Sequence, residues 1–289
     1  MTERKNLVAS ILARLKNIAK ENDVVYGEIL ARYAIERVLK RIELSEYASK
    51  CILKGGSLFI LWTEGFNYRP TMDADLEFRG DGSPAALKAM FKSIAKIAVD
   101  DGISIDDESI DAAAIREDDE YGGVRVTMMG YLGKVRIPVQ FDVGIGDAIT
   151  PAPKKFSFPA LLDLPAPKLK IYPRETVIAE KYETIVKRGL ANSRMKDYYD
   201  LWVLSNDPVV DKEIAKLAIE RTFSRRKQKL PETCPDGLVD SFAENQIKLT
   251  QWNAFLRKNR LDVGPNSFLD VVRQVRGFIE AILGRINSI

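Results

Sequence analysis

Histidine is absent from the 289 residues of this chain, and its absence excludes several kinds of chemistry. There is no Ser-His-Asp or Cys-His nucleophile, no imidazole general base and no histidine metal ligand. Cysteine occurs only twice, as Cys51 and Cys234, far apart in the sequence. This indicates neither a disulfide framework nor a cysteine zinc site. Any catalysis must therefore use carboxylates, lysine, tyrosine or a bound metal ion.

Long apolar runs are also lacking, since no run approaches the ~20 residues of a membrane span. The charged N-terminus, "MTERKNLVAS", begins an amphipathic helix and does not resemble a signal peptide. We therefore expect a cytoplasmic protein with no membrane contact. The formal charge of +3 does not by itself indicate a nucleic acid partner. However, Lys and Arg outnumber Asp and Glu from residue 171 onward, which favours a polyanionic partner for that part.

The order of the expected elements predicts two domains. Apolar spacing of three and four residues predicts helices over 6–20 and 24–42, and another over 84–100. Strands are expected at "CILK", at "TMDADLEF" and on both sides of "GYLGK". Residues 150–173 hold six of the thirteen prolines and are interpreted as an extended connector, after which almost everything is helical. The fold class is α+β: a mixed sheet with flanking helices over 1–165, then an α-helical domain over 166–289.

Three carboxylates stand on alternate residues of one expected strand: Asp73, Asp75 and Glu77. Alternation points them the same way, about 6.6 Å apart along the chain. Two such charges repel by roughly 2–3 kcal/mol at an effective dielectric near 20, and a divalent cation reverses the sign of that term. Carboxylate oxygens on this pattern suit Mg²⁺. The alternative is the solvated outer face of an edge strand.

Asp142 is the one charged residue in the apolar strand "IPVQFDVGIG". An isolated carboxylate is costly in a core strand unless it is paired or ligates an ion. Together with Asp73 and Asp75, it completes a set able to hold two metal ions. The alternative is a structural ion pair, with Arg136 as the candidate partner.

A glycine turn precedes the carboxylate strand. Gly55, Gly56 and Ser57 offer backbone N–H groups and a hydroxyl to phosphate oxygens, although a simple tight turn is the alternative. Lys54 and Arg69 are further candidates for binding phosphate. Arg69 has a surface role as its alternative.

Two helices of the C-terminal part carry a second candidate pair. Over 174–189, Lys181 lies at the margin of the buried stripe, so its stem packs while its ammonium reaches a cleft. Over 193–207, Asp197 flanks the packed face, which we assign to Tyr198, Leu201, Trp202 and Ser205, and Asp200 is expected to point away. The alternative for Lys181 and Asp197 is an interhelical salt bridge.

Four segments in order resemble one known family: "ERVLKRIELSEYASKCILKGGSLFILW", "YRPTMDADLEF", "VQFDVGIGD" and "VIAEKYETIVKRGLANSRMKDYYDLW". The glycine-serine turn, the D-x-D strand and the later aspartate are similar to the DNA polymerase β-type nucleotidyltransferases. The four segments together resemble the AbiEii-type nucleotidyltransferase toxins of type IV toxin–antitoxin and abortive-infection systems. The resemblance runs from about Ile35 to Leu204.

The resemblance implies a growth-inhibiting toxin with a cognate antitoxin. It would transfer a nucleotide from a nucleoside triphosphate to RNA, with the 3′ end of tRNA as the expected acceptor. Asp73, Asp75 and Asp142 would hold Mg²⁺, with Mn²⁺ as the alternative ion. Lys181 and Asp197 would complete the catalytic set. The nucleotide-binding residues would be Lys54, Gly55, Gly56, Ser57, Arg69 and Lys181.

Other readings remain open. The acceptor hydroxyl could belong to a protein or a small molecule, or the chain could be an inactive relative that binds RNA or a partner protein. The basic runs 221–229 and 257–260 are candidates for holding an RNA backbone, with Phe223 and Trp252 for base stacking. The alternative for these runs is a solvated charged face.

Overall fold

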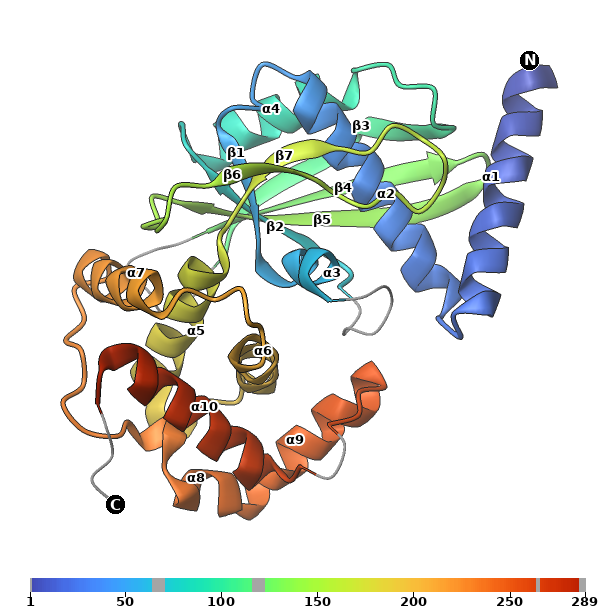
Figure 1. Cartoon of the computed structure of the whole chain (residues 1–289). Coiled ribbons are helices and arrows are strands. Elements are labelled where there is room, and N and C mark those ends of the chain that lie inside the picture. The colour runs from blue at the N-terminus through green and yellow to red at the C-terminus, as the bar shows by residue number, and fades with distance from the viewer. Residues whose placement is uncertain (1, 64–70, 116–122, 264–265, 286–289) are drawn as a thin grey trace. The chain divides into compact units, whose positions relative to one another are not determined.

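The computed structural model describes residues 2–63, 71–115, 123–263 and 266–285 (Figure 1). Contacts divide the chain into two compact units. The first comprises residues 1–146 and 154–171, and the second comprises 147–153 and 172–289. Contacts place the main division after Ile171 and assign the short segment 147–153 to the second unit. The predicted domain boundary at 165/166 stays a prediction.

The first unit is built on a seven-stranded mixed sheet with the order β3-β4-β5-β2-β1-β7-β6 (Figure 1). β2 runs parallel to β5 and β1 parallel to β7, while the other neighbouring pairs are antiparallel. The strands are β1 (Cys51–Lys54), β2 (Ala74–Phe78), β3 (Ile103–Ala114), β4 (Val124–Leu132), β5 (Val135–Ile145), β6 (Lys154–Ser157) and β7 (Lys168–Ile171).

One face of the sheet is apolar and covered by helices. Alternate residues of the central strands point to this face and are buried, among them Leu53, Leu76, Val126 and Phe141. α2 (Tyr26–Leu44) and α4 (Pro84–Ala95) pack against the sheet and against each other, and α1 (Thr2–Glu21) packs on α2. A 3₁₀ turn, η1 (Gly55–Leu58), and α3 (Phe59–Trp62) follow β1. This arrangement confirms the predicted α+β class and leaves the opposite face to polar side chains.

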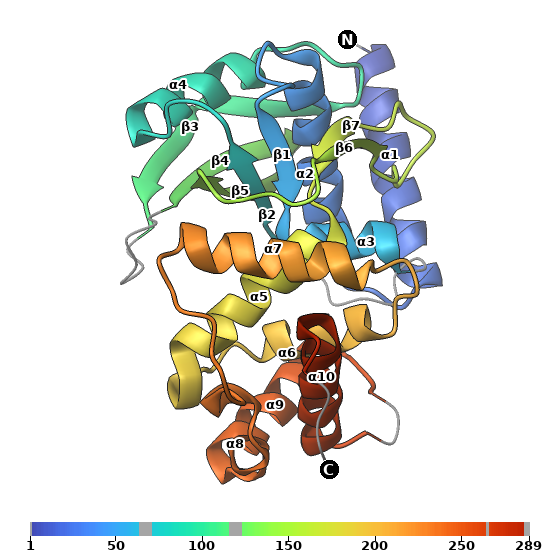
Figure 2. The ribbon, with the colours of Figure 1, turned by 60° about the vertical axis from the view of Figure 1, so that its left-hand side comes forward.

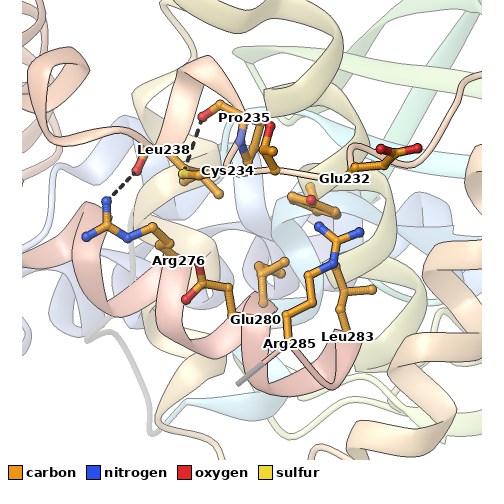
Figure 3. Close-up of a pocket in the computed structure, with 11 residues that line it drawn as sticks. Glu232, Cys234, Pro235, Leu238, Arg276, Glu280, Leu283 and Arg285 are labelled. Carbon is orange, nitrogen blue, oxygen red and sulfur yellow. Dashed lines mark hydrogen bonds between the residues drawn. The ribbon is translucent and has the colours of Figure 1, made fainter. Parts of the chain in front are cut away.

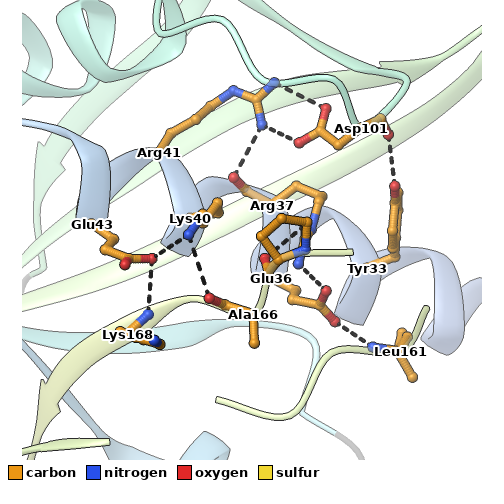
Figure 4. A network of polar contacts seen from close by, with 11 residues as sticks. Tyr33, Glu36, Arg37, Lys40, Arg41, Glu43, Asp101, Leu161, Ala166 and Lys168 are labelled. Carbon is orange, nitrogen blue, oxygen red and sulfur yellow. Dashed lines mark hydrogen bonds and ion pairs between the residues drawn. The ribbon is translucent and has the colours of Figure 1, made fainter. Parts of the chain in front are cut away.

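A buried ion pair fixes α2 to the loop before β3 (Figure 4). Arg41 donates to both carboxylate oxygens of Asp101, at 2.6 and 3.1 Å, and both side chains are almost fully buried. Tyr33 donates to the Asp101 carbonyl at 2.6 Å. Removing one partner of such a pair costs about 3–5 kcal/mol, so this contact holds the register of α2.

The same helix holds the chain between β6 and β7 (Figure 4). The backbone N–H of Leu161 donates to Glu36 at 2.9 Å, and the N–H of Lys168 donates to Glu43 at 2.9 Å. The proline-rich stretch is therefore not a free connector, and that prediction is wrong. Three of its prolines, Pro159, Pro165 and Pro167, lie between two strands that complete the sheet. In that sheet Leu53 of β1 is in register with Ile171 of β7.

Three further differences concern the elements and their bounds. β3 was not predicted, because its exposed positions are acidic and the strand lies at the sheet edge, where little apolar alternation is needed. The helix expected over 84–100 ends at Ala95. Asp73 lies just before β2, which begins at Ala74, so only Asp75 and Glu77 of the alternating carboxylates are strand residues.

The second unit is helical (Figure 2). Its core is rich in aromatic side chains. Trp252 stacks on Phe268 with ring centroids 4.8 Å apart, and Tyr198 stacks on Phe242 at 5.5 Å. The helices are α5 (Arg174–Arg188), α6 (Met195–Ser205), α7 (Lys212–Arg225), α8 (Asp240–Glu244), α9 (Gln246–Asn259) and α10 (Phe268–Leu283), with short 3₁₀ turns η2 (Gly189–Ala191) and η3 (Asp236–Leu238). In the described part of the chain, no helix combines the length and apolar character that crossing a bilayer requires.

Candidate functional site

The glycine turn and the carboxylate strand meet in the structure. Gly55 has a φ of +73°, a conformation that side chains disfavour, and a Cβ there would overlap the carboxylate of Asp75. The turn backbone therefore lies directly against Asp75. Ser57, two residues on, is buried. The predicted association of the Gly-Gly-Ser turn with the D-x-D segment thus has a steric basis.

Four charged residues form a row across the face of the sheet opposite α2 and α4. Arg125 of β4 is in register with Asp142 of β5, which is in register with Asp75 of β2, which is in register with Lys54 of β1. Neighbouring strands are about 4.7–4.9 Å apart, and residues in register share a face. Two carboxylates therefore stand side by side, with a cation on the strand beyond each.

Asp142 is engaged by Arg125. The Nε and Nη2 of Arg125 donate to the two oxygens of Asp142, both at 2.8 Å, and Gln140 donates to Oδ1 at 3.2 Å. The Arg125 side chain is 47% exposed and that of Asp142 is 19% exposed. The sequence alternative of a paired aspartate is thus realised with Arg125 and not with Arg136.

The charge of Arg125 acts on all three predicted metal ligands. The hydrogen bonds that it donates to Asp142 raise the pKa of its guanidinium, and the negative charges of Asp142, Asp73 and Asp75 raise it further. Arg125 was not singled out from the sequence. Cross-strand register, which the sequence does not show, is what places it beside Asp142.

Lys54 lies on the other side of Asp75 and bonds to Glu77. Its Nζ is 3.1 Å from Glu77 Oε2, and the Glu77 side chain is buried. A Cβ on Gly144, the neighbour of Glu77 on β5, would meet both charged groups, so glycine leaves the room for this pair. Glu77 therefore balances Lys54, and Asp73 and Asp75 remain the acidic candidates of this segment.

The donor chemistry at the row fits a hard divalent cation, because Asp73, Asp75 and Asp142 offer carboxylate oxygens. The contact between the Gly55 backbone and Asp75 is the kind of cradle that such a site uses. Within the described residues, however, no group of three or more His, Cys, Asp or Glu side chains is placed to hold a metal ion. Asp142 instead faces Arg125, a cation of the chain itself.

Lys181 and Asp197 form a second charged cluster, inside the helical unit. Lys181 Nζ is 2.9 Å from Asp197 Oδ1 and 2.7 Å from Asp200 Oδ2, while Arg194 donates to Asp197 Oδ2 at 2.8 Å. The prediction that Asp200 points away is wrong, because its side chain is fully buried against Lys181. Two cations and two anions balance each other here.

The electrostatics of this cluster favour ionised Asp197. Its burial alone would raise the pKa, but the ammonium of Lys181 and the guanidinium of Arg194 outweigh burial and hold the pKa below its ordinary value. The interhelical salt bridge considered from the sequence is therefore present. The role of Lys181 and Asp197 in catalysis stays a prediction, and Arg69 lies outside the described residues.

The stacking role predicted for two aromatic residues is wrong. Phe223 and Trp252 are each 2% exposed and belong to the core of the helical unit. In the basic run 221–229, Arg226 forms ion pairs with Glu180, Glu183 and Asp147. These contacts make Arg226 a structural residue.

A separate pocket of about 300 Å³ lies in the helical unit (Figure 3). Tyr182, Leu238, Ile279 and Leu283 contribute apolar surface, and Cys234 and the charged residues Arg276, Arg285, Glu232 and Glu280 lie around them. Arg276 donates to the Leu238 carbonyl at 3.2 Å and to Asp240 at 2.9 Å. Burial raises the pKa of the Cys234 thiol, so the thiol is a poor nucleophile. All residues lining this pocket lie outside the predicted site.

Comparison with known proteins now adds the family. Residues 37–274 match the family model described as nucleotidyl transferase AbiEii toxin of type IV toxin–antitoxin systems. The chain therefore belongs to the AbiEii family of nucleotidyltransferase toxins, which confirms the resemblance seen in its motifs. Membership implies a nucleotide substrate and a cognate antitoxin. No curated protein matches the chain in sequence.

Two solved structures from Helicobacter pylori are similar to the chain. One is described as a putative nucleotidyltransferase, with 14% identity, a TM-score of 0.47 and coverage of 86% of this chain and 92% of that chain. The other, JHP933, has 15% identity, a TM-score of 0.45 and coverage of 86% and 89%.

Proposed function

We propose that this chain is a metal-dependent nucleotidyltransferase toxin that transfers a nucleoside monophosphate from a nucleoside triphosphate to RNA, at the 3′ end of tRNA. The observation that carries the proposal is the placement of Asp75 and Asp142. They stand in register on adjacent parallel strands, with the backbone of Gly55 against Asp75, in a chain of a nucleotidyltransferase toxin family.

In this proposal Asp73, Asp75 and Asp142 hold Mg²⁺ or Mn²⁺. The bound ion would neutralise charge on the phosphates and make the acceptor hydroxyl easier to deprotonate. The hydroxyl oxygen attacks the α-phosphorus, the bond to the β-phosphate oxygen breaks, and pyrophosphate leaves. Asp142 accepts the hydroxyl proton, a role that falls to a carboxylate because the chain has no histidine.

The glycine turn has a binding role. Backbone N–H groups of Gly55 and Gly56 and the hydroxyl of Ser57 would hold the β- and γ-phosphates, and Lys54 would add a positive charge at the end of β1. Lys181 and Asp197 stay predicted members of the catalytic set through the family resemblance. Extension of the tRNA end would stop translation. We propose the cytoplasm as the place of this activity, because tRNA and nucleoside triphosphates are found there.

The test is incorporation of label from each α-labelled nucleoside triphosphate, with Mg²⁺, into total bacterial tRNA or into bacterial protein. Asp142→Asn should lower incorporation by about 10²–10⁴-fold, as loss of a positioned base does. Asp75→Asn should also lower incorporation strongly, because it removes a proposed ligand of the metal ion. Asp111→Asn is the matched control, because Asp111 is an exposed acid of the edge strand β3 that pairs with Lys88.

Label in tRNA that depends on Asp75 and Asp142, but not on Asp111, supports the whole proposal. Label in protein instead would overturn the RNA acceptor and favour modification of a protein hydroxyl. Incorporation that survives both substitutions would overturn the assignment of the site.

A further inference from the structure

Arg125 faces the part of the sheet where the proposed metal ligands lie. It stands in register with Asp142, at the end of the row that continues to Asp75. Its guanidinium takes up both oxygens of Asp142 in a bidentate contact, at 2.8 Å for each. Planar contacts of this kind fix the carboxylate orientation as well as neutralise its charge.

The contact uses the lone pairs that a metal ion would need. Oδ1 of Asp142 accepts from both Arg125 and Gln140, and Oδ2 accepts from Arg125. A carboxylate has about four lone-pair sites, so Oδ1 is filled and Oδ2 keeps one. A divalent ion placed between Asp142 and Asp75 would also be repelled by the neighbouring guanidinium.

Arg125 is able to leave this position. Its side chain is about half exposed, so a released guanidinium enters water and not the protein interior. The Glu77 carboxylate differs from the Arg125 guanidinium, because Glu77 is buried against Lys54 and cannot move into water. Of the two cations of the row, Lys54 therefore contacts a buried carboxylate, whereas Arg125 is about half exposed.

We propose that Arg125 is a positioning residue that holds Asp142 through its bidentate contact, and that a divalent ion binds Asp142 by displacing Arg125. The proposal rests on the proposed function, since it concerns the metal site of that activity. Arg125 and the ion compete for Asp142. The chain therefore binds the ion more weakly than its carboxylates alone would allow.

The test measures Mn²⁺ affinity of the full chain by titration calorimetry, without nucleotide. Arg125→Gln should bind Mn²⁺ at least about 10-fold tighter. A neighbouring positive charge weakens proton binding to a carboxylate by about 10-fold or more, and we expect a similar effect on binding of a metal cation. Arg136→Gln is the matched control. Arg136 is exposed on the same strand as Asp142, six residues or about 20 Å away, and should not change the affinity.

Arg125→Lys is the second variant, in case Arg125→Gln does not fold. Lysine keeps the charge but loses the bidentate contact, so its affinity should lie between those of the wild type and of a neutral residue. In an Asp142→Asn background, Arg125→Gln should have no effect on Mn²⁺ binding. Affinity that is equal or weaker in both Arg125 variants overturns the proposal, as does absence of Mn²⁺ binding.

This readout separates the inference from the function on which it rests. If the wild type transfers nucleotide but the Arg125 variants bind Mn²⁺ with unchanged affinity, the inference about Arg125 is wrong and the proposed function stands. If Arg125→Gln binds Mn²⁺ more tightly but the wild type transfers nucleotide to no acceptor, the proposed function is wrong and the inference about Arg125 stands.

Discussion

Gly55 shows how one residue supports both the backbone and the candidate chemistry. Its positive φ allows the chain to turn out of β1, and its missing side chain leaves room for the Asp75 carboxylate. The sequence suggested a phosphate-binding role for this turn. The structure adds a steric requirement, because a Cβ at this position would overlap the Asp75 carboxylate and displace it.

Replacing Gly55 by Ala should therefore affect stability and the candidate site together. The left-handed backbone costs a non-glycine residue roughly 1–2 kcal/mol, and the methyl group displaces Asp75. We expect urea unfolding to show that loss and Mn²⁺ affinity to fall. Gly277→Ala is the control, since nothing lies within 4 Å of a Cβ at this helical site and Ala should stabilise by about 0.5–1 kcal/mol. A Gly55→Ala chain with unchanged stability and Mn²⁺ affinity would contradict the steric argument.

For single residues, the sequence was enough to identify the acidic candidates of the site but not the residues that pair with them. Asp142 stood out as the one charge in an apolar segment. Arg125 is likewise the one charged residue of β4, but only register matches it to Asp142. The predicted orientation of Asp200 was wrong because an apolar stripe identifies only the apolar buried face of a helix. α6 also buries a charged side, which Lys181 neutralises.

At the scale of elements, strands with few apolar residues were the ones missed. β3 carries several acidic residues, and lysines at four-residue spacing on α4 and at its C-cap pair with them. The pairs are Lys88 with Asp111, Lys92 with Glu108 and Lys96 with Asp107. These pairs are exposed and add little stability. β7 joins the sheet through parallel pairing with β1, more than a hundred residues earlier, and such distant pairing leaves no local pattern.

The helix pair α5–α6 makes stability depend on pH through Asp197. Its pKa is held below the ordinary value in the folded chain, whereas the unfolded chain protonates it near pH 4. As the pH falls below about 4, the unfolded state therefore binds one more proton, and the free energy of unfolding decreases. The loss continues until the pH reaches the folded-state pKa and amounts to about 1.4 kcal/mol per pH unit for one proton.

The measurement is urea unfolding between pH 5 and pH 3 for the wild type and Asp197→Asn. The variant should be less stable at pH 5, because Lys181 and Arg194 lose a buried partner. Its free energy of unfolding should also fall less steeply with decreasing pH. Equal slopes would show that Asp197 is not held ionised by these two cations.

For the whole molecule, the notable feature is that the two units alternate along the chain. Residues 147–153 belong to the helical unit, and 154–171 return to the sheet. The short segment is held by Thr176, whose hydroxyl accepts from the Thr150 N–H and donates to the Thr150 carbonyl, both at 2.8 Å. Arg221 also donates to the Thr150 hydroxyl at 3.2 Å. Proline content alone does not reveal this alternation, because proline marks bends and not membership of a unit.

Thr176→Val should expose the importance of this attachment. Valine fills the same space but leaves a buried backbone N–H and carbonyl of Thr150 without their partner, which costs about 1–3 kcal/mol. Thr184→Val is the matched control on the same helix. The Thr184 hydroxyl bonds only to the Glu180 carbonyl of its own helix and is half-buried, so the cost should be within about 0.5 kcal/mol. Equal losses in the two variants, measured by urea unfolding, would contradict the prediction.

The return of the chain to the sheet has a consequence for how such genes recombine. A single crossover between two related genes at codon 147 would take the sheet up to β5 from one parent, and β6 and β7 with the helical unit from the other. The parallel contact between β1 and β7 would then join strands of different ancestry. Toxins of this architecture should therefore exchange their helical units freely only among parents whose β1 and β7 remain compatible.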